Sequence, residues 1–346
     1  MSKIATNGSV AADIAKGWKP NNYLTNMSVA YFQPDDWFVS PFVFPILPVQ
    51  LSTSYYYIFD KGDLARDNVQ RKPEFGKATP MMFGSKQELY SCEVDQIIIG
   101  IDQISTLNYQ RSAAPGIIDP RRSKVRLATE QLKLHMDRAF ADGYFKPGVW
   151  TNEWAGVTTT PSGNQFYKFS DSNCDPVKFI GDRRVEMMRE GRRRPNVLAL
   201  GVETYEALKN NASILDRVKY SGSTANPATV NANVLAQLFE IDRVVVLNST
   251  YNKGGYGSTN MDFVCDSKGA LLAYAAPNPA IDEVSAGYTF AWDMLGNGQY
   301  LAFDQYEGEK GTHTEFIEGL TSYTSKKVCD ELGNRLIYFL ASVGCE

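Results

Sequence analysis

The clearest pattern of apolar positions in the chain predicts one long helix over residues 120–142. Apolar side chains recur there every three or four residues, as on the buried stripe of a helix: Val125, Ala128, Leu132, Met136, Ala139 and Phe140. Asp119 suits the N-cap, Pro120 the first helical position, and Gly143 a left-handed C-terminal cap. Such a helix spans roughly 35 Å, which is close to the width of a domain, so we expect it to be a structural spine.

Residues 50–92 instead predict a long β-hairpin loop. Its ascending side, Thr53–Phe59, is rich in aromatic strand formers, and its return side passes through Glu88–Tyr90 toward a strand at Ile97–Ile99. Residues 60–77 are mostly charged residues, Gly and Pro, and we expect no helix in them. Because such a segment cannot bury a core, we expect it to project, and long projecting loops often carry function.

After a Gly/Thr/Ser-rich link at 156–164, the pattern alternates between helices and short apolar strands. We predict helices over 175–192, 204–209, 212–219 and 231–240, and strands over 196–201, 243–247, 263–265, 270–274 and 288–294. A turn is expected at Gly296–Gly298, and two long strands are expected over 312–341, around Glu331–Asn334. This region is predicted to be α/β.

Residues 1–40 show no clear period and carry scattered aromatics that end in Trp37 and Phe38. Such a segment cannot bury its own apolar groups. We therefore expect an arm that lies on a neighbouring subunit, with docking in a groove of its own subunit as the alternative.

Composition narrows the class of protein. The 35 Lys and Arg against 39 Asp and Glu give a net charge of −4, which argues against a surface devoted to binding a polyanion. The 43% hydrophobic fraction excludes wholesale disorder. No apolar run reaches the roughly 18 residues of a membrane helix, and the first twenty residues lack a signal-peptide core, so we expect no membrane partner.

The search for catalytic chemistry finds no candidate. His135 and His313 are the two histidines of the chain, and both are better explained as packing or surface residues than as general bases. The five cysteines contain no C-x-x-C pair and suit free thiols in a reducing cytoplasm. Gly255–Gly257 is interpreted as a surface loop. We therefore expect no enzymatic activity, no catalytic residue, no metal and no cofactor.

Charged clusters are the remaining candidates for function, and we interpret them as subunit contacts. The loop tip carries Lys61, Asp63, Arg66, Arg71, Lys72 and Glu74. Two basic runs follow: Arg121, Arg122, Lys124 and Arg126, then Arg192, Arg193 and Arg194. The last run suits a helix C-terminus, where cations are favoured by the helix dipole. The first run lies at the helix N-terminus, where the dipole disfavours cations, so we expect it to bind an outside partner: a carboxylate of a neighbouring subunit or a phosphate. The 11 carboxylates against 4 cations from Asp282 to Glu346 supply candidates.

An ordered series of segments resembles one known family. The segments are Tyr57–Asp63 with Arg66 and Arg71–Pro73, Asp119–Pro120 with Thr151–Trp154, Arg194–Gly201, Tyr205–Leu208, Ile214–Lys219, and Leu235–Phe239 with Val244–Leu247. In this order, between an arm and long return strands, they resemble the major capsid proteins of tailed bacteriophages, which have the HK-97-like fold. The match covers roughly residues 40–341.

The resemblance implies an α+β fold with five parts. These are an N-terminal arm (1–49), an extended loop (50–93) that overlaps the adjacent subunit, a peripheral domain with the spine helix (94–174), an α/β axial domain (175–300), and return strands of the peripheral domain (301–346). It further implies a structural protein that assembles into hexamers and pentamers of an icosahedral shell in the host cytoplasm.

The partners that the resemblance implies are copies of the same chain, a portal, a scaffolding or decoration protein, and the packaged double-stranded DNA by non-specific proximity. Since only about 40 residues precede the loop, we expect no cleaved scaffolding segment, and we expect no crosslink between a loop lysine and Asn334. Two alternatives stay open: an encapsulin-like shell around protein cargo, and a β-rich carbohydrate-active hydrolase.

Overall fold

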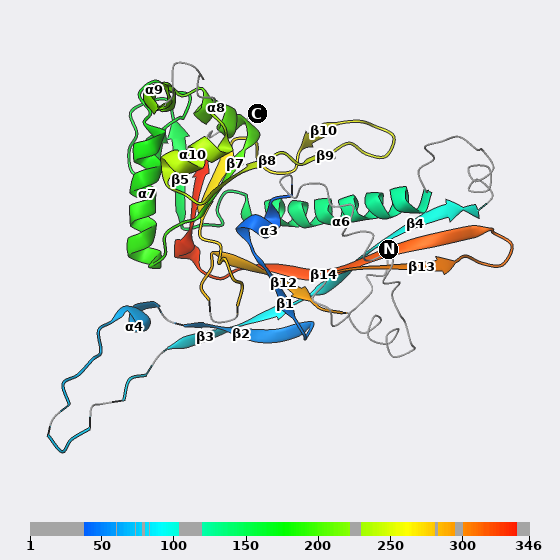
Figure 1. The fold of residues 1–346 in the computed structure, drawn as a ribbon, viewed down its shortest axis with the longest axis horizontal. Coiled ribbons are helices and arrows are strands. Elements are labelled where there is room, and N and C mark those ends of the chain that lie inside the picture. The colour runs from blue at the N-terminus through cyan, green and yellow to red at the C-terminus, as the bar shows by residue number, and fades with distance from the viewer. Residues whose placement is uncertain are drawn as a thin grey trace, which may run out of the picture.

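The computed structural model describes residues 38–59, 61–72, 74–77, 80–82, 84–103, 120–221, 230–280, 283–294 and 300–337. Residues 1–37 of the expected arm, the N-cap candidate Asp119, the turn expected at Gly296–Gly298 and residues 338–341 of the last expected strand lie outside this part. Figure 1 shows an elongated molecule with a helix-rich lobe at one end, a long sheet with its helix running from it, and a projecting loop.

A five-stranded sheet forms the elongated part. Its strands are β1 (Ile46–Val49), β4 (Glu93–Asp102), β12 (Gly287–Trp292), β13 (Leu301–Glu307) and β14 (Thr314–Lys327). The long strand β14 is the centre of the sheet, because it pairs antiparallel with β12, β13 and β4, and β1 adds parallel to β12.

The predicted spine is helix α6 (Pro120–Tyr144), which lies along this sheet (Figure 1). Val125, Ala128 and Leu132 are buried against Phe303 and Ile317 of the sheet. Met136 and Phe140 are buried as well, so the predicted apolar stripe is confirmed except at Ala139, which is exposed. The cap expected at Gly143 is wrong, because the helix continues through this residue to Tyr144. Tyr144 is itself packed against Phe44 and Phe140, and this contact holds the last turn in helical form.

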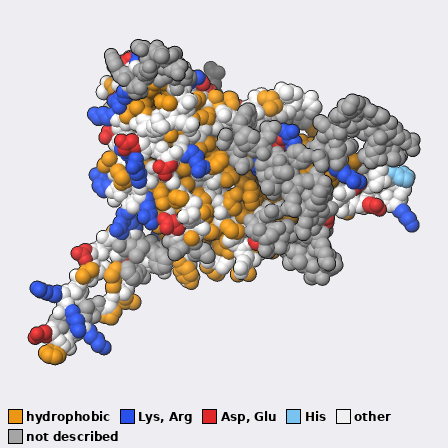
Figure 2. Space-filling model, viewed as in Figure 1, with side chains coloured by type: hydrophobic (Ala, Val, Ile, Leu, Met, Phe, Trp, Pro, Cys, Tyr) orange, Lys and Arg blue, Asp and Glu red, His pale blue; other side chains and the backbone are white. Residues whose placement is uncertain are grey.

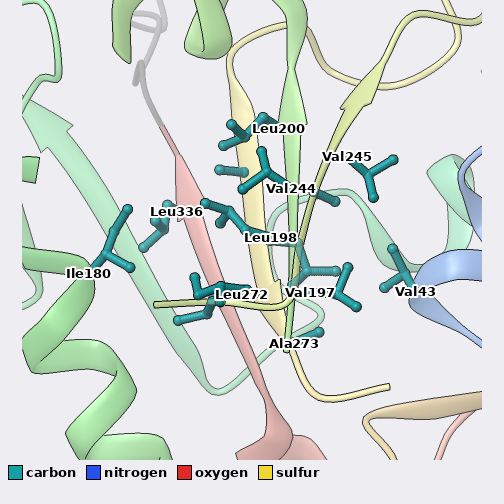
Figure 3. Packing of buried hydrophobic residues seen from close by; sticks show 14 of the residues in the cluster. Val43, Ile180, Val197, Leu198, Leu200, Val244, Val245, Leu272, Ala273 and Leu336 are labelled. Atoms are coloured by element: carbon teal, nitrogen blue, oxygen red, sulfur yellow. The ribbon is translucent and has the colours of Figure 1, made fainter. Parts of the chain in front are cut away.

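A mixed six-stranded sheet forms the core of the helix-rich lobe. Its order is β6 (Gln165–Tyr167), β5 (Asn152–Val157), β15 (Gly333–Ile337), β11 (Gly269–Ala273), β7 (Val197–Gly201) and β8 (Arg243–Leu247). Every residue of β7 and β11 is buried, as expected of strands covered on both faces. Figure 3 shows the side chains of Leu198, Leu272 and Leu336 among the packed apolar residues of this core.

Four helices surround this sheet, and all four were predicted. They are α7 (Pro176–Gly191), α8 (Val202–Lys209), α9 (Ala212–Ser221) and α10 (Ala232–Phe239). Asp175 caps α7 by accepting hydrogen bonds from the backbone N–H groups of Val177 and Lys178, and Asn231 caps α10 in the same way.

The predicted hairpin is formed by β2 (Thr53–Phe59) and β3 (Ser85–Ser91), which pair antiparallel. The expectation of a helix-free tip is wrong, since residues 61–65 form the short helix α4 (Lys61–Ala65). Its aspartate is held in place because the Asp63 carboxylate accepts a hydrogen bond from the N–H of Gly84 across the loop, at 3.1 Å. The tertiary contact, and not the local sequence, supports this turn of helix.

The remaining elements are short. Helix α3 (Ser40–Val43) precedes β1, the 3₁₀ helix η2 (Asp330–Leu332) precedes β15, and β9 (Thr250–Asn252) pairs with β10 (Met261–Phe263). Gly255–Gly257 lies in the exposed turn of this β9–β10 ribbon, as the sequence predicted.

The two sheets draw on segments that are far apart in the chain. The two strands expected over 312–341 are present, but β14 belongs to the five-stranded sheet and β15 to the six-stranded sheet, between β5 and β11. Likewise, residues 46–49, at the end of the segment that we expected to form the arm, are a strand of the five-stranded sheet.

Candidate subunit-interface surfaces

The base of the hairpin is packed firmly into the subunit. Tyr90 stacks on Phe290 of β12 with ring centroids 4.6 Å apart, and Tyr56 lies on the same ring at 5.2 Å. The Tyr56 hydroxyl donates a 2.6 Å hydrogen bond to Glu88, its cross-strand partner. Burial, followed by this hydrogen bond, raises the pKa of the Tyr56 hydroxyl. The loop therefore leaves the subunit from a rigid base.

The tip of the loop differs from its base in its charge and its exposure. Lys61 forms a 2.8 Å ion pair with Glu331 of η2 at the subunit end of the tip. Arg66, Arg71, Lys72 and Glu74 are exposed and form no ion pair with the part of the chain that the structure describes. Figure 2 shows Lys and Arg side chains gathered on this projecting segment at the lower left.

Large apolar side chains are exposed on the same tip. Val69 is 91% exposed, Met82 is 89% exposed, and Phe75 is fully exposed with a left-handed backbone at φ 59°. A bulky residue in this conformation is strained and exposes its ring to water. The tip therefore carries both unpaired charge and unburied apolar surface, which is the composition of a contact surface.

The first basic run is partly explained within the subunit. Arg121 forms a 2.9 Å ion pair with the nearly buried Glu315 of β14, and Arg126 bonds Glu130 one turn further along α6 at 3.1 Å. The carboxylate that we expected from a neighbouring subunit is thus supplied to Arg121 by the acidic C-terminal segment, residues 282–346, of the same chain. Lys124 is half-buried, and the side chain of Arg122 lies outside the described part.

The second basic run follows α7. Arg192 is the left-handed C-cap residue of this helix, and its N–H donates to the carbonyl of Met188. Arg193 forms a 3.0 Å ion pair with Glu283, and Arg194 donates to the backbone carbonyl of Glu240. These contacts tie the end of α7 to two loops of the same subunit. Whether either basic run also contacts a second subunit stays a prediction.

Sequence reasoning missed a buried carboxylate that fixes the start of the described chain. Asp137 of α6 is 1% exposed and accepts hydrogen bonds from the N–H groups of Val39 and Ser40, at 3.1 and 3.0 Å, and from the Ser249 hydroxyl at 3.2 Å. Burial raises the pKa of the Asp137 carboxyl, and the donated hydrogen bonds oppose this rise in part. One side chain thus joins the spine helix, the segment before α3 and the β8–β9 connection.

The titratable residues that the structure describes give no sign of a catalytic centre. His135 lies 3.5 Å from Asp95, and the hydrogen bond to the Asp95 carboxylate is the main cause of the raised pKa of His135. Burial raises the pKa of the Cys92 and Cys174 thiols to about 12, so these residues pack as apolar groups. Within the described residues there is no metal-ligand cluster, and no helix there is both long and apolar enough to cross a bilayer.

Comparison with known proteins gives one clear relative in sequence. The major capsid protein of Burkholderia phage BcepMu is 24% identical over 233 residues, which cover 66% of this chain and 68% of that protein. No family model matches the chain.

Solved structures resemble the whole fold at lower identity. A phage-related protein of Bordetella bronchiseptica RB50 has a TM-score of 0.70 at 17% identity, over 92% of this chain and 97% of its own. The putative capsid protein of a prophage of Escherichia coli CFT073 has a TM-score of 0.51 at 10% identity, over 92% and 99%. The SrpI encapsulin of Synechococcus elongatus PCC 7942 has a TM-score of 0.50 at 10% identity, over 90% of both chains.

These likenesses agree with the architecture of an α+β subunit that combines a spine helix, a projecting hairpin loop and two sheets. The resemblance expected from the sequence, and the fold class with it, are confirmed. The chain has the HK-97-like fold and is similar to the major capsid proteins of phages.

Proposed function

We propose that this protein is the major capsid protein of a tailed phage. It is a structural subunit without enzymatic activity, and it assembles with copies of itself into hexamers and pentamers of an icosahedral shell around double-stranded DNA. The observation that carries the proposal is the hairpin loop. Its base is packed on Phe290, whereas its tip exposes Arg71, Lys72 and Phe75, which find no ion pair or apolar pocket among the described residues.

The proposed division of the chain follows the resemblance. The extended loop (50–93) reaches over the adjacent subunit, the axial domain (175–300) meets its copies around the hexamer and pentamer axes, and the spine helix belongs to the peripheral domain (94–174 with 301–346). The strand pairing modifies this division, because β5 and β15 of the peripheral domain lie in the same sheet as β7 and β11 of the axial domain. The axial and peripheral parts are therefore joined through a shared sheet and are expected to move as one body.

The proposal includes partners other than the chain itself. They are a portal, a scaffolding protein and a decoration protein. The DNA is held by proximity and not by sequence-specific contacts, in agreement with the net charge of −4. Assembly is expected in the host cytoplasm and without a membrane.

An encapsulin-like shell with protein cargo is the alternative, since SrpI shares the fold. The phage relative in sequence favours the viral shell. Particles purified after nuclease treatment separate the two, because a viral shell retains double-stranded DNA and a cargo shell retains protein. The hydrolase alternative receives no support from the comparisons, in which the relative in sequence and two of the solved structures are capsid or encapsulin proteins.

Shortening the loop tests the proposal directly. Replacement of residues 66–77 by a short Gly/Ser turn keeps α4, the Lys61–Glu331 ion pair and the bond from Gly84 to Asp63. We expect the subunit to keep its circular dichroism and its cooperative unfolding, while closed shells are lost or fall apart in high salt. Normal shells from this variant would show that the tip is not the contact that closes them.

The charge at the tip is tested by reversing Arg71 and Lys72 to Glu, with Lys146→Glu as the matched control at an exposed cation outside the loop. Each exposed pair contributes only about 0–1 kcal/mol, but a shell repeats it in every subunit. Assembly should therefore fail in the loop variant and persist in the control.

A further inference from the structure

The β9–β10 ribbon is a second projection of the subunit, and it points away from the hairpin loop (Figure 1). Its base is fixed, because the N–H of Val264 donates to the carbonyl of Ser249 at 2.9 Å. The guanidinium of Arg138 on α6 also lies 5.3 Å from the ring centre of Tyr251. The Ser249 hydroxyl donates to the buried Asp137. The ribbon is therefore attached firmly to the spine helix at its base.

One side chain orders the turn of this ribbon, residues 253–260. The side-chain oxygen of Asn252 accepts hydrogen bonds from the N–H groups of Gly254 and Asn260, at 3.0 and 2.8 Å. Its amide group donates to the carbonyl of Ser258 at 2.8 Å. The turn thus has a defined shape that bonds within the ribbon maintain. A turn that is ordered in advance loses less conformational entropy when it binds a partner.

The ordered turn presents one large side chain. Tyr256 is fully exposed, and a glycine stands on each side of it. No charged residue occurs between Lys253 and Asp262, which pair with each other at 3.5 Å. Tyrosine among Gly, Ser and Asn is typical of loops that bind proteins, because the ring supplies contact area with few rotatable bonds and the small polar residues adapt to the partner. The turn therefore has the composition of an uncharged protein-binding loop.

A surface that suits this turn lies on the opposite edge of the subunit. In Figure 1 the ribbon points to the right, whereas α7 forms the left edge. Val185 and Met188 of α7 are 55% and 39% exposed, and their spacing places them on one face of the helix with Gly181. A Cβ added at Gly181 would meet nothing within 4 Å, so there is open space beside the two apolar side chains. Gly181, Val185 and Met188 are called the α7 stripe below.

The symmetry of a ring brings these two edges together. In a closed ring of identical subunits, each contact joins one surface of a copy to a different surface of the next copy. The base of the hairpin and the end of α7 line one groove, so both belong to the same edge. In the proposed shell this edge faces one adjacent copy, and the ribbon faces the other. Because the turn is uncharged, it can approach the exposed Asp182 and Arg189 beside the stripe without repulsion.

We propose that Tyr256 of one subunit packs on the α7 stripe of an adjacent copy. The ring covers Val185 and Met188, and the small polar residues of the turn surround the ring. Asn252 is a positioning residue in this contact, since it acts through the shape of the turn. The inference rests on the proposed function, because the two edges meet only when subunits form a ring.

Photo-crosslinking in assembled particles tests the inference. Tyr256 is replaced by p-benzoylphenylalanine, shells are assembled from an equal mixture of ¹⁴N- and ¹⁵N-labelled chains, and crosslinked peptides are mapped by mass spectrometry. We expect mixed heavy–light crosslinks from position 256 to the peptide that contains Val185 and Met188. The same replacement at Tyr306, an exposed tyrosine of the five-stranded sheet, is the matched control and should give no crosslink to this peptide.

Substitutions measure the strength of the contact without a crosslinker. Tyr256→Ala should leave the urea midpoint of the unassembled subunit unchanged, because the ring is fully exposed there. It should raise the protein concentration required for shell formation about tenfold or more, since truncation of an aromatic anchor weakens an interface by at least this factor. Tyr256→Phe should assemble like the wild type, and Asn252→Ala should weaken assembly although the tyrosine remains. Adding Val185→Ala to Tyr256→Ala should weaken assembly no further, because the two residues share one contact.

The outcomes separate this inference from the proposed function. Shells in which position 256 crosslinks only within one copy, or to another segment, would overturn the inference and leave the proposed function intact. Shell formation by Tyr256→Ala at the wild-type concentration would have the same meaning. A wild-type chain that forms no shell under any condition would refute both.

Discussion

Replacement of Asp137 separates two effects of a buried carboxylate on the stability of the subunit: the cost of burying its charge and the gain from the hydrogen bonds that it accepts. In Asp137→Asn the side-chain oxygen can still accept from Val39 and Ser40, and the new amide N–H can donate to the Ser249 hydroxyl. In Asp137→Ala these groups lose their acceptor while α3 remains packed on the helix. The Asn variant therefore removes the charge alone, and the Ala variant removes the hydrogen bonds as well.

The two variants should differ by several kcal/mol. Each backbone N–H left buried without an acceptor costs about 1–3 kcal/mol, so Asp137→Ala is expected to lose about 2–5 kcal/mol of unfolding free energy. Asp137→Asn should lose about 1 kcal/mol or less at neutral pH, because it also removes the cost of holding an ionised group in a buried site.

The sign of the pH dependence follows from the raised pKa. A carboxyl whose pKa is higher in the folded than in the unfolded protein stabilises the fold most at low pH, and this contribution is lost as the pH rises through the folded value. The stability of the wild type relative to Asp137→Asn should therefore fall between about pH 4 and neutrality, by at most about 1.4 kcal/mol per pH unit. Ionisations that both chains share cancel in this difference.

Urea unfolding of the unassembled full-length chain, followed by tryptophan fluorescence at several pH values, measures both quantities. Equal losses in the two variants would show that the charge itself, and not the hydrogen-bond acceptor, holds the segment before α3. A wild-type advantage that grows as the pH rises would mean that the carboxyl has a lowered pKa, and the reasoning from burial would be refuted.

Three further predictions concern packing. Leu132→Asp should place an unpaired charge between α6 and the sheet and cost several kcal/mol, so soluble, fully assembled particles of this variant would show that another face of the helix is buried. In Gly333→Ala the new Cβ would lie 2.0 Å from a tryptophan ring carbon, so the urea midpoint should fall by the equivalent of about 1–3 kcal/mol, whereas Gly181→Ala, which meets nothing within 4 Å, should raise it slightly. With pKa values of about 12, Cys92 and Cys174 should react with maleimide far more slowly in the folded chain at pH 8 than in urea, and equal rates would contradict their burial.

Local patterns were sufficient for the longer helices of the fold. The period of apolar residues located α6, and Asp175–Pro176 located the start of α7, because helix faces and caps are set by residues within one or two turns. The short helix α4 was missed since its support comes from Gly84, about twenty residues further along the chain. That the consecutive strands β14 and β15 belong to different sheets was not foreseen, because strand pairing depends on residues far apart in the chain.

The candidate surfaces could be predicted only in part. The charges of the loop tip were visible in the sequence, but the partners of Arg121 and Arg193 inside the subunit were not, since Glu315 and Glu283 lie far from them in the chain. In the sequence alone, Asp137 cannot be distinguished from an ordinary exposed aspartate of a helix. One turn before it, Lys133 is also buried, and these two polar residues widen the buried face of α6 beyond the apolar stripe. The sequence signal for this site was a pair of polar residues, Lys133 and Asp137, beside the apolar stripe of α6. That these residues are buried becomes clear only in the structure, where α3 packs on the helix.

The position of β15 in the six-stranded sheet has a consequence for synthesis on the ribosome. This strand lies between β5 and β11, yet it is made after both of them and after every other strand of that sheet. Until residue 337 has left the ribosome, β5 and β11 each keep an unpaired edge, and the sheet cannot close. A nascent or prematurely ended chain therefore lacks the middle of this sheet, and only chains translated to this point can fold into building blocks for assembly.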